Sequence, residues 1–288
     1  MGWRYVMFTS GALVFIMSIL RITVIRLRET PKYLLGIGED GKVVDTLTWL
    51  AIKYNRELVL SEADLKECGT VVSTHSGAKF SLDEMAVHFR GLFATSKVAR
   101  STLLIWLSWA MMGLVYPLFW VFLPKYLADL GVPGDSSPHE TWRNYALSNI
   151  SALLGPLLAG YLCNLRFLGR RYTMTIGALL TAAMLFGFTS VRTNAGNVGF
   201  SCAVSFFLNI YYGTLYAYTP EVLPSAHRAT GNGVAVAFNR IMGILSAVIA
   251  TFSNTATTAP LYICAGLVIA MGFITPFFPF EPYGRRSS

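Results

Sequence analysis

The chain has 288 residues, of which 54% are hydrophobic and 13% are charged, and its mean hydropathy is +0.51. About a quarter of the residues in an ordinary soluble domain are charged, so this composition excludes water as the main solvent and also excludes a disordered chain. The formal net charge of +8 acquires a meaning only from the positions of the basic residues.

Seven stretches are apolar enough for a helix that crosses a bilayer, which takes about 20 residues. In chain order they are residues 5–20, 103–123, 145–165, 172–188, 198–218, 233–252 and 261–277. The first has some features of a secretory signal, but its positive charges mostly follow the apolar core and no small-residue cleavage motif comes after it. We therefore expect it to be a retained span.

Basic residues gather in every second connection between these spans. Residues 26–100 hold eleven Lys and Arg, and later basic groups include Arg170, Arg171, Arg228 and Arg285. Loops rich in Lys and Arg stay on the cytoplasmic side, so we expect an N-terminus outside and a cytosolic C-terminus. We also expect the chain to lie in the plasma membrane. We expect no nucleic-acid partner, because the charge follows the loops and forms no basic face with interleaved aromatic residues.

The long first connection contains two amphipathic patterns. Apolar residues recur at helical spacing at Val43, Leu47, Leu50 and Tyr54, and again at Leu82, Met85, Phe89 and Leu92. The second pattern begins at Ser81 with the spacing of a capping box. Both segments are too short and too charged to span a membrane, so we expect helices that lie against the cytoplasmic ends of the spans. We expect residues 57–79 between them to be irregular.

Four motifs occur one after another in the loops of the chain. They are Arg28-Glu29-Thr30-Pro31-Lys32-Tyr33-Leu34, Leu168-Gly169-Arg170-Arg171, Glu221-Val222-Leu223-Pro224 with Arg228 and Gly231, and Pro279-Phe280-Glu281-Pro282-Tyr283-Gly284-Arg285. This set resembles the loop motifs of the sugar porter branch of the major facilitator superfamily. Tyr218-Thr219-Pro220-Glu221 is also similar to the synaptic-vesicle-glycoprotein-like branch.

The resemblance implies an all-α integral membrane protein: the C-terminal six-helix half of a major facilitator fold, plus one preceding span. It predicts a single span over residues 1–25, a cytoplasmic loop over 26–100, a six-span bundle over 101–280 and a tail over 281–288. The chain then corresponds to spans six to twelve of the family. We expect it to be incomplete as given, to need a missing N-terminal half or self-association as partner, and not to transport by itself.

Arg240 is the residue that most strongly indicates a site. It stands near the middle of a predicted span, where an arginine costs about 3 kcal/mol on insertion scales. With its neighbour Asn239, it could bind an anionic or hydroxyl-rich solute in a water-filled cavity. The alternative is a structural arginine that reaches the interface or a helix-end carbonyl.

Two further faces carry side chains that suit a polyol or an aromatic ligand. Asn209, Tyr212 and Tyr216 share one face of their predicted span, and Trp109 and Tyr116 share a face of another. The resemblance implies that both spans line the cavity of this half. Aromatic stripes are also common in helix packing and at membrane interfaces, which stays the alternative for each of these residues.

The resemblance also implies a cytoplasmic gate. Its acidic and basic residues are Glu29, Arg170, Arg171, Glu221 and Arg228. We expect acid–base contacts that hold the helix ends together in one state of the transport cycle and break in the other. The alternative is that these residues only fix the orientation of the chain in the membrane.

No phosphate-binding loop, dinucleotide fingerprint, zinc-protease or serine-hydrolase motif occurs, so we expect neither an enzyme nor a cofactor. The four cysteines and four histidines have no metal-ligand spacing, so we expect no metal site. We expect a secondary active transporter that moves a small polar solute, a sugar or an organic ion, through the lipid bilayer by alternating access, coupled to an ion. The alternative is a non-transporting seven-span receptor, sensor or scaffold.

Overall fold

The computed structural model describes residues 2–25, 29–36, 38–67, 82–129, 138–191, 193–224, 227–252 and 259–282, and each regular element in these ranges is helical. The chain divides into two compact units, Met1–Lys79 and Phe80–Ser288. The first unit holds α1 (Gly2–Leu20), a π-helical turn (Arg21–Ile25), α2 (Pro31–Gly36), α3 (Asp40–Lys53) and α4 (Glu62–Glu67). The second holds α5 (Leu82–Gly91), α6 (Ser96–Asp129), α7 (Pro138–Cys163), α8 (Gly169–Phe188), α9 (Asn194–Val222), α10 (Arg228–Phe252), α11 (Ala259–Ile274) and a 3₁₀ turn (Thr275–Phe277).

Seven helical segments in the described ranges are long and apolar enough to cross a membrane. They are Arg4–Val24, Ser96–Trp120, Trp142–Cys163, Gly169–Phe188, Asn194–Val222, Arg228–Phe252 and Ala259–Phe277. Each overlaps one of the spans predicted from hydropathy, so the all-α membrane architecture is confirmed. Several helices extend beyond the apolar stretch, because backbone hydrogen bonding continues where polar side chains begin.

The first unit contains the first predicted amphipathic helix. Val43 on α3 is fully buried, and α2 packs against α3 with Leu34 also buried. Tyr54, the last residue of the predicted stripe, lies just beyond the end of α3 and is exposed. The apolar periodicity therefore placed the helix correctly, apart from its C-terminal end.

The expectation of irregular structure over residues 57–79 is wrong for residues 62–67, which form α4, while residues 68–79 lie outside the described residues. Ser61 and Asp64 form a reciprocal cap there: the Ser61 N–H donates to Asp64 Oδ2 at 2.8 Å, and the Asp64 N–H donates to Ser61 Oγ at 3.3 Å. Such a cap satisfies backbone donors that the first turn of a helix leaves free. The Ser61 hydroxyl also donates to Asp64 Oδ2, at 2.8 Å. The backbone and hydroxyl donors of Ser61 lower the pKa of Asp64, because both favour the charged carboxylate.

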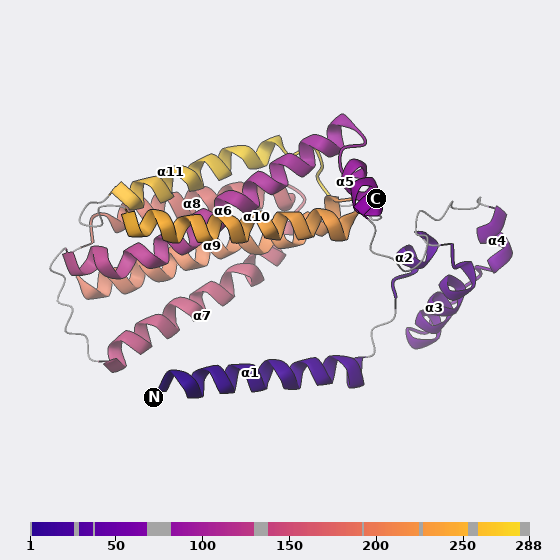
Figure 1. The fold of residues 1–288 in the computed structure, drawn as a ribbon, viewed down its shortest axis with the longest axis horizontal. Coiled ribbons are helices and arrows are strands. Elements are labelled where there is room, and N and C mark those ends of the chain that lie inside the picture. Colours follow the sequence, from indigo (N-terminus) through magenta and orange to yellow (C-terminus); the bar gives the residue numbers. More distant parts are fainter. Residues whose placement is uncertain are drawn as a thin grey trace. The chain divides into compact units, whose positions relative to one another are not determined.

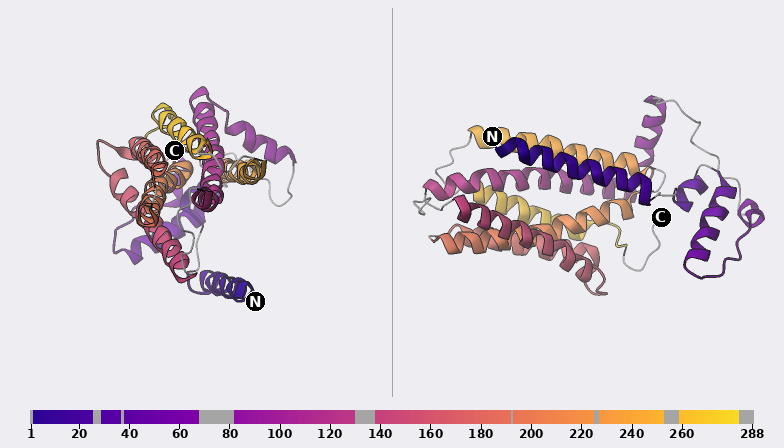
Figure 2. Two further views of the ribbon diagram at one scale, coloured as in Figure 1. Left: turned by 90° about the vertical axis from the view of Figure 1, so that its left-hand side faces the viewer. Right: turned by 90° about the horizontal axis from the view of Figure 1, so that it is seen from below.

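The second unit is a helix bundle built from two packed groups. α6 packs against α10 and α11, while α9 packs against α7 and α8, and α11 joins the groups by packing on α8. The end-on view in Figure 2 shows this arrangement, and Figure 1 shows α10 running along α6. Large side chains fill the centre of the bundle, among them the fully buried Trp109, Phe119, Tyr211 and Tyr218.

The second amphipathic helix, α5, belongs to this bundle. Leu92, just after α5, is fully buried, and its carbonyl accepts a hydrogen bond of 3.2 Å from Thr102 Oγ1 on α6. Phe89 packs its ring on Trp106, with centroids 5.7 Å apart. In the structure α6 begins at Ser96, and the unit that holds the bundle begins at Phe80.

Candidate functional site

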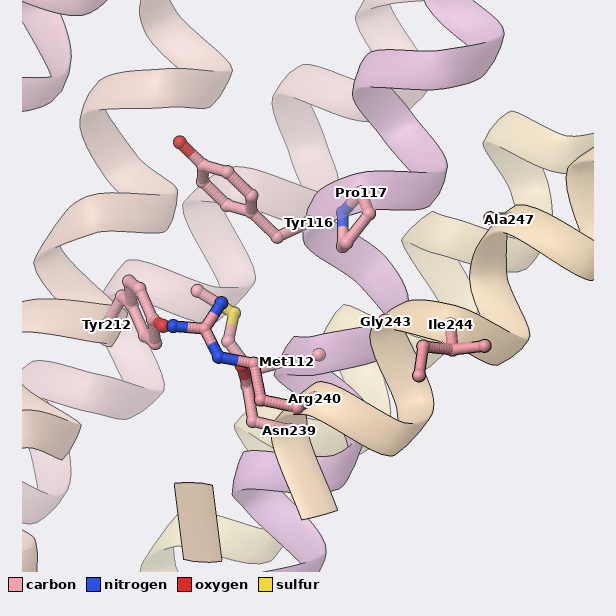
Figure 3. Close-up of a pocket in the computed structure, with 10 residues that line it drawn as sticks. Met112, Tyr116, Pro117, Tyr212, Asn239, Arg240, Gly243, Ile244 and Ala247 are labelled. Atoms are coloured by element: carbon pink, nitrogen blue, oxygen red, sulfur yellow. The ribbon is translucent and has the colours of Figure 1, made fainter. Parts of the chain in front are cut away.

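A cavity of about 610 Å³ lies between α6, α9 and α10 (Figure 3). Its polar and aromatic lining comes from Tyr116 on α6, Tyr212 on α9, and Asn239 and Arg240 on α10. Apolar residues such as Met112 and Ile244 complete the lining. Four of the seven residues predicted to bind solute are therefore brought together in one space.

Arg240 lies at the midpoint of α10, and its side chain is exposed in the cavity. Figure 3 shows its guanidinium directed toward Tyr212, from which it is within electrostatic reach. None of the ion pairs found among the described residues involves Arg240, and none of the described lining residues is acidic. A mid-span guanidinium without a carboxylate needs water or a ligand to accept its hydrogen bonds, and the cavity provides the room for either.

Two more predicted residues form the aromatic wall behind the lining. Trp109 is fully buried, and its ring meets Tyr216 edge to face, with centroids 4.6 Å apart. The Tyr212 and Tyr216 rings are 4.8 Å apart, and their hydroxyl oxygens lie at 3.3 Å. Tyr116 follows, with its centroid 6.2 Å from that of Tyr212. The four rings make one continuous aromatic surface across α6 and α9.

The cavity depends on close contact between α6 and α10. A Cβ added at Gly113 would lie 2.3 Å from the backbone oxygen of Asn239, so only glycine allows this approach. The Asn239 side chain reinforces the contact, because its Nδ2 donates to the carbonyl of Trp109 at 3.2 Å. Asn239 therefore holds the two helices together in addition to lining the cavity.

Asn209, by contrast, is not among the residues that line this cavity. Its Nδ2 donates to the carbonyl of Ser205 on the same helix at 2.8 Å. A Cβ added at Gly155 on α7 would lie 3.0 Å from the Asn209 Cβ, which places Asn209 in the packing between α7 and α9. The structure therefore separates it from the other predicted solute-binding residues.

Four of the five predicted gate residues, Arg170, Arg171, Glu221 and Arg228, lie at one end of the bundle. This end, called the basic end below, consists of the starts of α8 and α10, the end of α9 and residues 275–282. Arg170 Nη2 donates to Glu221 Oε1 at 2.8 Å, and Arg170 Nε pairs with Glu221 Oε2. The planar guanidinium thus holds the carboxylate with two nitrogens, a geometry that lysine cannot reproduce.

Glu281 is the functional candidate that the sequence analysis missed. Its two carboxylate oxygens accept the backbone N–H groups of Arg170 and Arg171, at 3.0 and 3.2 Å. These donors open α8, where the helix dipole favours a negative charge. Gly169, with φ +57°, brings the backbone so close that an added Cβ would lie 2.8 Å from Glu281 Oε1. The residue is part of the terminal motif, but its partner is a helix end, which a pattern of charged residues does not reveal.

A family model described as Major Facilitator Superfamily matches residues 1–247 and, in an overlapping alignment, residues 135–287. The chain belongs to the major facilitator superfamily. It is 37% identical to MFS siderochrome iron transporter 1 of Ceriporiopsis subvermispora, over 100% of the chain and 57% of that protein. It is 35% identical to major facilitator-type transporter hxnZ of Emericella nidulans, over 100% of the chain and 54% of the relative.

A bacterial relative covers a shorter part of this major facilitator chain. Niacin transporter NiaP of Acinetobacter baylyi is 32% identical over 57% of the chain and 36% of its own length. The chain spans about half the length of the two fungal relatives. The relatives are named as transporters, which agrees with the expectation of a transport protein and is consistent with a protein that is not an enzyme.

Three predicted gate residues of this major facilitator chain lie outside the Arg170–Glu221 pair. Arg171 Nη2 donates to the carbonyl of Pro276 after α11. Arg228 begins α10, and its Nε and Nη2 are buried without a hydrogen-bond partner in the described part of the chain. Glu29 belongs to the Met1–Lys79 unit, where it is exposed just before α2. The gating roles of all five residues stay predictions.

Proposed function

We propose that this chain is the C-terminal part of a secondary active transporter that moves a small polar solute, a sugar or an organic ion, by alternating access. In such transporters the solute binds near the bilayer midplane between two halves that rock about it. The observation that carries the proposal is Arg240, a mid-span arginine without a described carboxylate partner in a cavity wide enough for a small solute.

The lining of the cavity forms one wall of the proposed solute-binding site. Tyr116, Tyr212, Asn239 and Arg240 face a common space, and polar groups at mid-membrane depth are tolerated only against protein or water. We therefore propose that a second wall covers them, from an N-terminal half or from a second copy of the chain. On this account the 288 residues alone do not transport.

The basic end is the proposed cytoplasmic gate. Arg170 links α8 to the end of α9 through Glu221, and Glu281 ties the segment after α11 to the start of α8. Because these contacts join three helix ends, breaking them in one state of the cycle would free the ends to move. From the positive-inside rule we propose that this end faces the cytosol, and we propose the plasma membrane as its location.

We also propose a branch of the superfamily and an energy source for this chain. The order of the loop motifs favours the sugar porter or synaptic-vesicle-glycoprotein-like branch. We propose coupling to an ion gradient, since the chain has no nucleotide-binding motif to supply another energy source. The relatives' names specify different solutes, a siderochrome and niacin, so they do not decide the substrate.

The test is uptake into proteoliposomes. Vesicles would hold the chain alone, or the chain together with the part of the Emericella nidulans relative that it does not match. We expect saturable uptake of at least one solute from a set of labelled hexoses and organic anions in the combined vesicles only, and a strong reduction in Arg240→Ala. Arg143→Ala, at an exposed position on α7 outside the cavity, is the control. No saturable uptake of any solute would contradict the proposal.

A further inference from the structure

We infer that the cavity binds a monocarboxylate attached to a flat aromatic ring, with the carboxylate on Arg240 and the ring against Tyr116 and Tyr212. This inference rests on the proposed transport function only in that it concerns the same cavity. It names the class of solute from the charges and surfaces that the described residues present.

The charge of the site selects an anion. Among the described residues that line the cavity, Arg240 alone is charged. Its guanidinium presents several N–H donors in a planar fork, which fits the two oxygens of a carboxylate. The hydroxyl of Tyr212 lies beside it in Figure 3, and that hydroxyl is also 3.3 Å from the hydroxyl of Tyr216. A single fixed positive charge is matched by one negative charge, so the inference is a monoanion.

The aromatic surface selects a ring. In Figure 3 the Tyr116 ring lies above Tyr212 and Arg240 in the view. The Tyr116 and Tyr212 rings are tilted by 31° with centroids 6.2 Å apart, so both offer aromatic surface to the same space. Aromatic rings favour offset-stacked or edge-to-face contacts with one another. The Trp109 and Tyr216 rings contact Tyr212, with centroids 5.8 and 4.8 Å from that of Tyr212, which limits the movement of the Tyr212 ring before a ligand binds.

Other solutes fit the described lining less well. A hexose presents many hydroxyl groups and needs several amide or carboxylate partners, but Asn239 is the one carboxamide in the described lining and its Nδ2 already donates to Trp109. An organic cation would meet the charge of Arg240 with no described carboxylate to offset it. Both are included as competitors in the test.

The test is equilibrium binding of radiolabelled benzoate in nanodiscs of zwitterionic lipid to the 288-residue chain, purified together with the part of the Emericella nidulans relative that it does not match. We expect saturable binding that unlabelled benzoate displaces. We expect benzamide, which keeps the ring without the charge, and cyclohexanecarboxylate, which keeps the charge without the flat ring, to compete at least about tenfold more weakly. D-glucose and benzylamine should not compete.

Substitutions at Arg240 and Tyr212 test the carboxylate contact and the ring contact separately. Arg240→Ala should weaken benzoate binding by about 10- to 100-fold, the range for losing a charge-assisted hydrogen bond. Arg240→Lys should restore part of the loss, and Tyr212→Ala should reduce the preference for benzoate over cyclohexanecarboxylate. Arg143→Ala, which removes an arginine outside the cavity, should bind as the parent does. Unchanged helical content and a monodisperse elution profile show that a variant is folded.

Several results would overturn the inference: no saturable benzoate binding at millimolar concentration, equal affinity for benzamide, an Arg240→Ala variant with parental affinity, or displacement by D-glucose. Flux in the combined vesicles separates the two proposals. Arg240-dependent benzoate binding without flux of any solute removes the transport proposal and keeps the site. Hexose flux that Arg240→Ala does not change keeps transport and overturns the aromatic carboxylate.

Discussion

Arg170 and Arg240 are two arginines of the same helix bundle with opposite surroundings. Arg170 is bound by the Glu221 carboxylate, and its side chain is 19% exposed. Arg240 is exposed in the cavity, where the described lining holds no acid. Arg170 and Glu221 satisfy each other's charge at the basic end, whereas the charge in the cavity is left for water or a ligand. Unsatisfied polar groups of this kind mark a site because they cost stability.

We expect the largest loss of stability from a substitution at the contact between α6 and α10, next to the cavity. Gly113→Ala would place a methyl group 2.3 Å from the backbone oxygen of Asn239, so α6 and α10 must separate. Overpacking of this kind costs about 3 kcal/mol of unfolding free energy. Gly233→Ala on α10 is the matched control, because an added Cβ there meets nothing within 4 Å. Thermal unfolding in detergent measures both, and equal stability would show that the helices are not in backbone contact.

The second expected effect is at the Arg170–Glu221 pair. Arg170→Ala leaves the partly buried Glu221 carboxylate without its guanidinium, and we expect a loss of about 2 kcal/mol. Glu221→Gln should lose less, while shifting the protein toward the state in which the basic end is open. Cysteine accessibility from each side of the membrane measures that shift. An unchanged ratio of inside to outside labelling would remove the gating role.

The third expected effect concerns the cap on α8. Glu281→Ala frees the N–H groups of Arg170 and Arg171 and removes a negative charge from the helix N-terminus, with an expected loss of about 1 kcal/mol. Glu281→Gln should lose part of this, because the amide oxygen still accepts one bond. Hydrogen exchange at Arg170 and Arg171 reports the cap directly. Parental protection of both amides in Glu281→Ala would contradict it.

The fourth prediction compares the unfolding temperatures of Arg240→Ala and Arg170→Ala. Arg240→Ala should leave the unfolding temperature unchanged or raise it slightly, because no described ion pair is lost and a mid-span charge is removed. Arg170→Ala should lower it under the same conditions. A clear destabilisation by Arg240→Ala, comparable to that by Arg170→Ala, would mean that Arg240 has a structural role.

The smallest effect is expected at Asp64, which caps α4 from an exposed position. Its folded pKa lies below the ordinary 3.8, so the cap contributes above the unfolded pKa and is lost as the pH falls through the folded value. Carboxyl NMR should show Asp64 titrating below its ordinary range, with a return toward it in Ser61→Ala. Titration at the ordinary value in both forms would show that the cap does not persist in solution.

The sequence by itself determined the spans, the helix α3 and the mid-span position of Arg240. Hydropathy and apolar periodicity are local properties, and a charge in the middle of an apolar stretch is visible without knowing its neighbours. It also predicted that Arg170 and Glu221 lie at the same end, because alternate loops of a spanning chain share a side. The helix α4 escaped prediction because its evident signal is a short local cap and not an apolar stripe.

Only the tertiary structure decided which of these groups touch. Asn209 and Tyr212 are three residues apart, and at about 100° per residue their directions differ by about 60°. That difference is enough to turn Asn209 toward α7 while Tyr212 lines the cavity. The choice of Arg170 over Arg171 as partner of Glu221, and of the α8 N-terminus as partner of Glu281, joins residues far apart in the chain. Such contacts depend on how the helices pack against one another, which the spacing of residues along one helix does not contain.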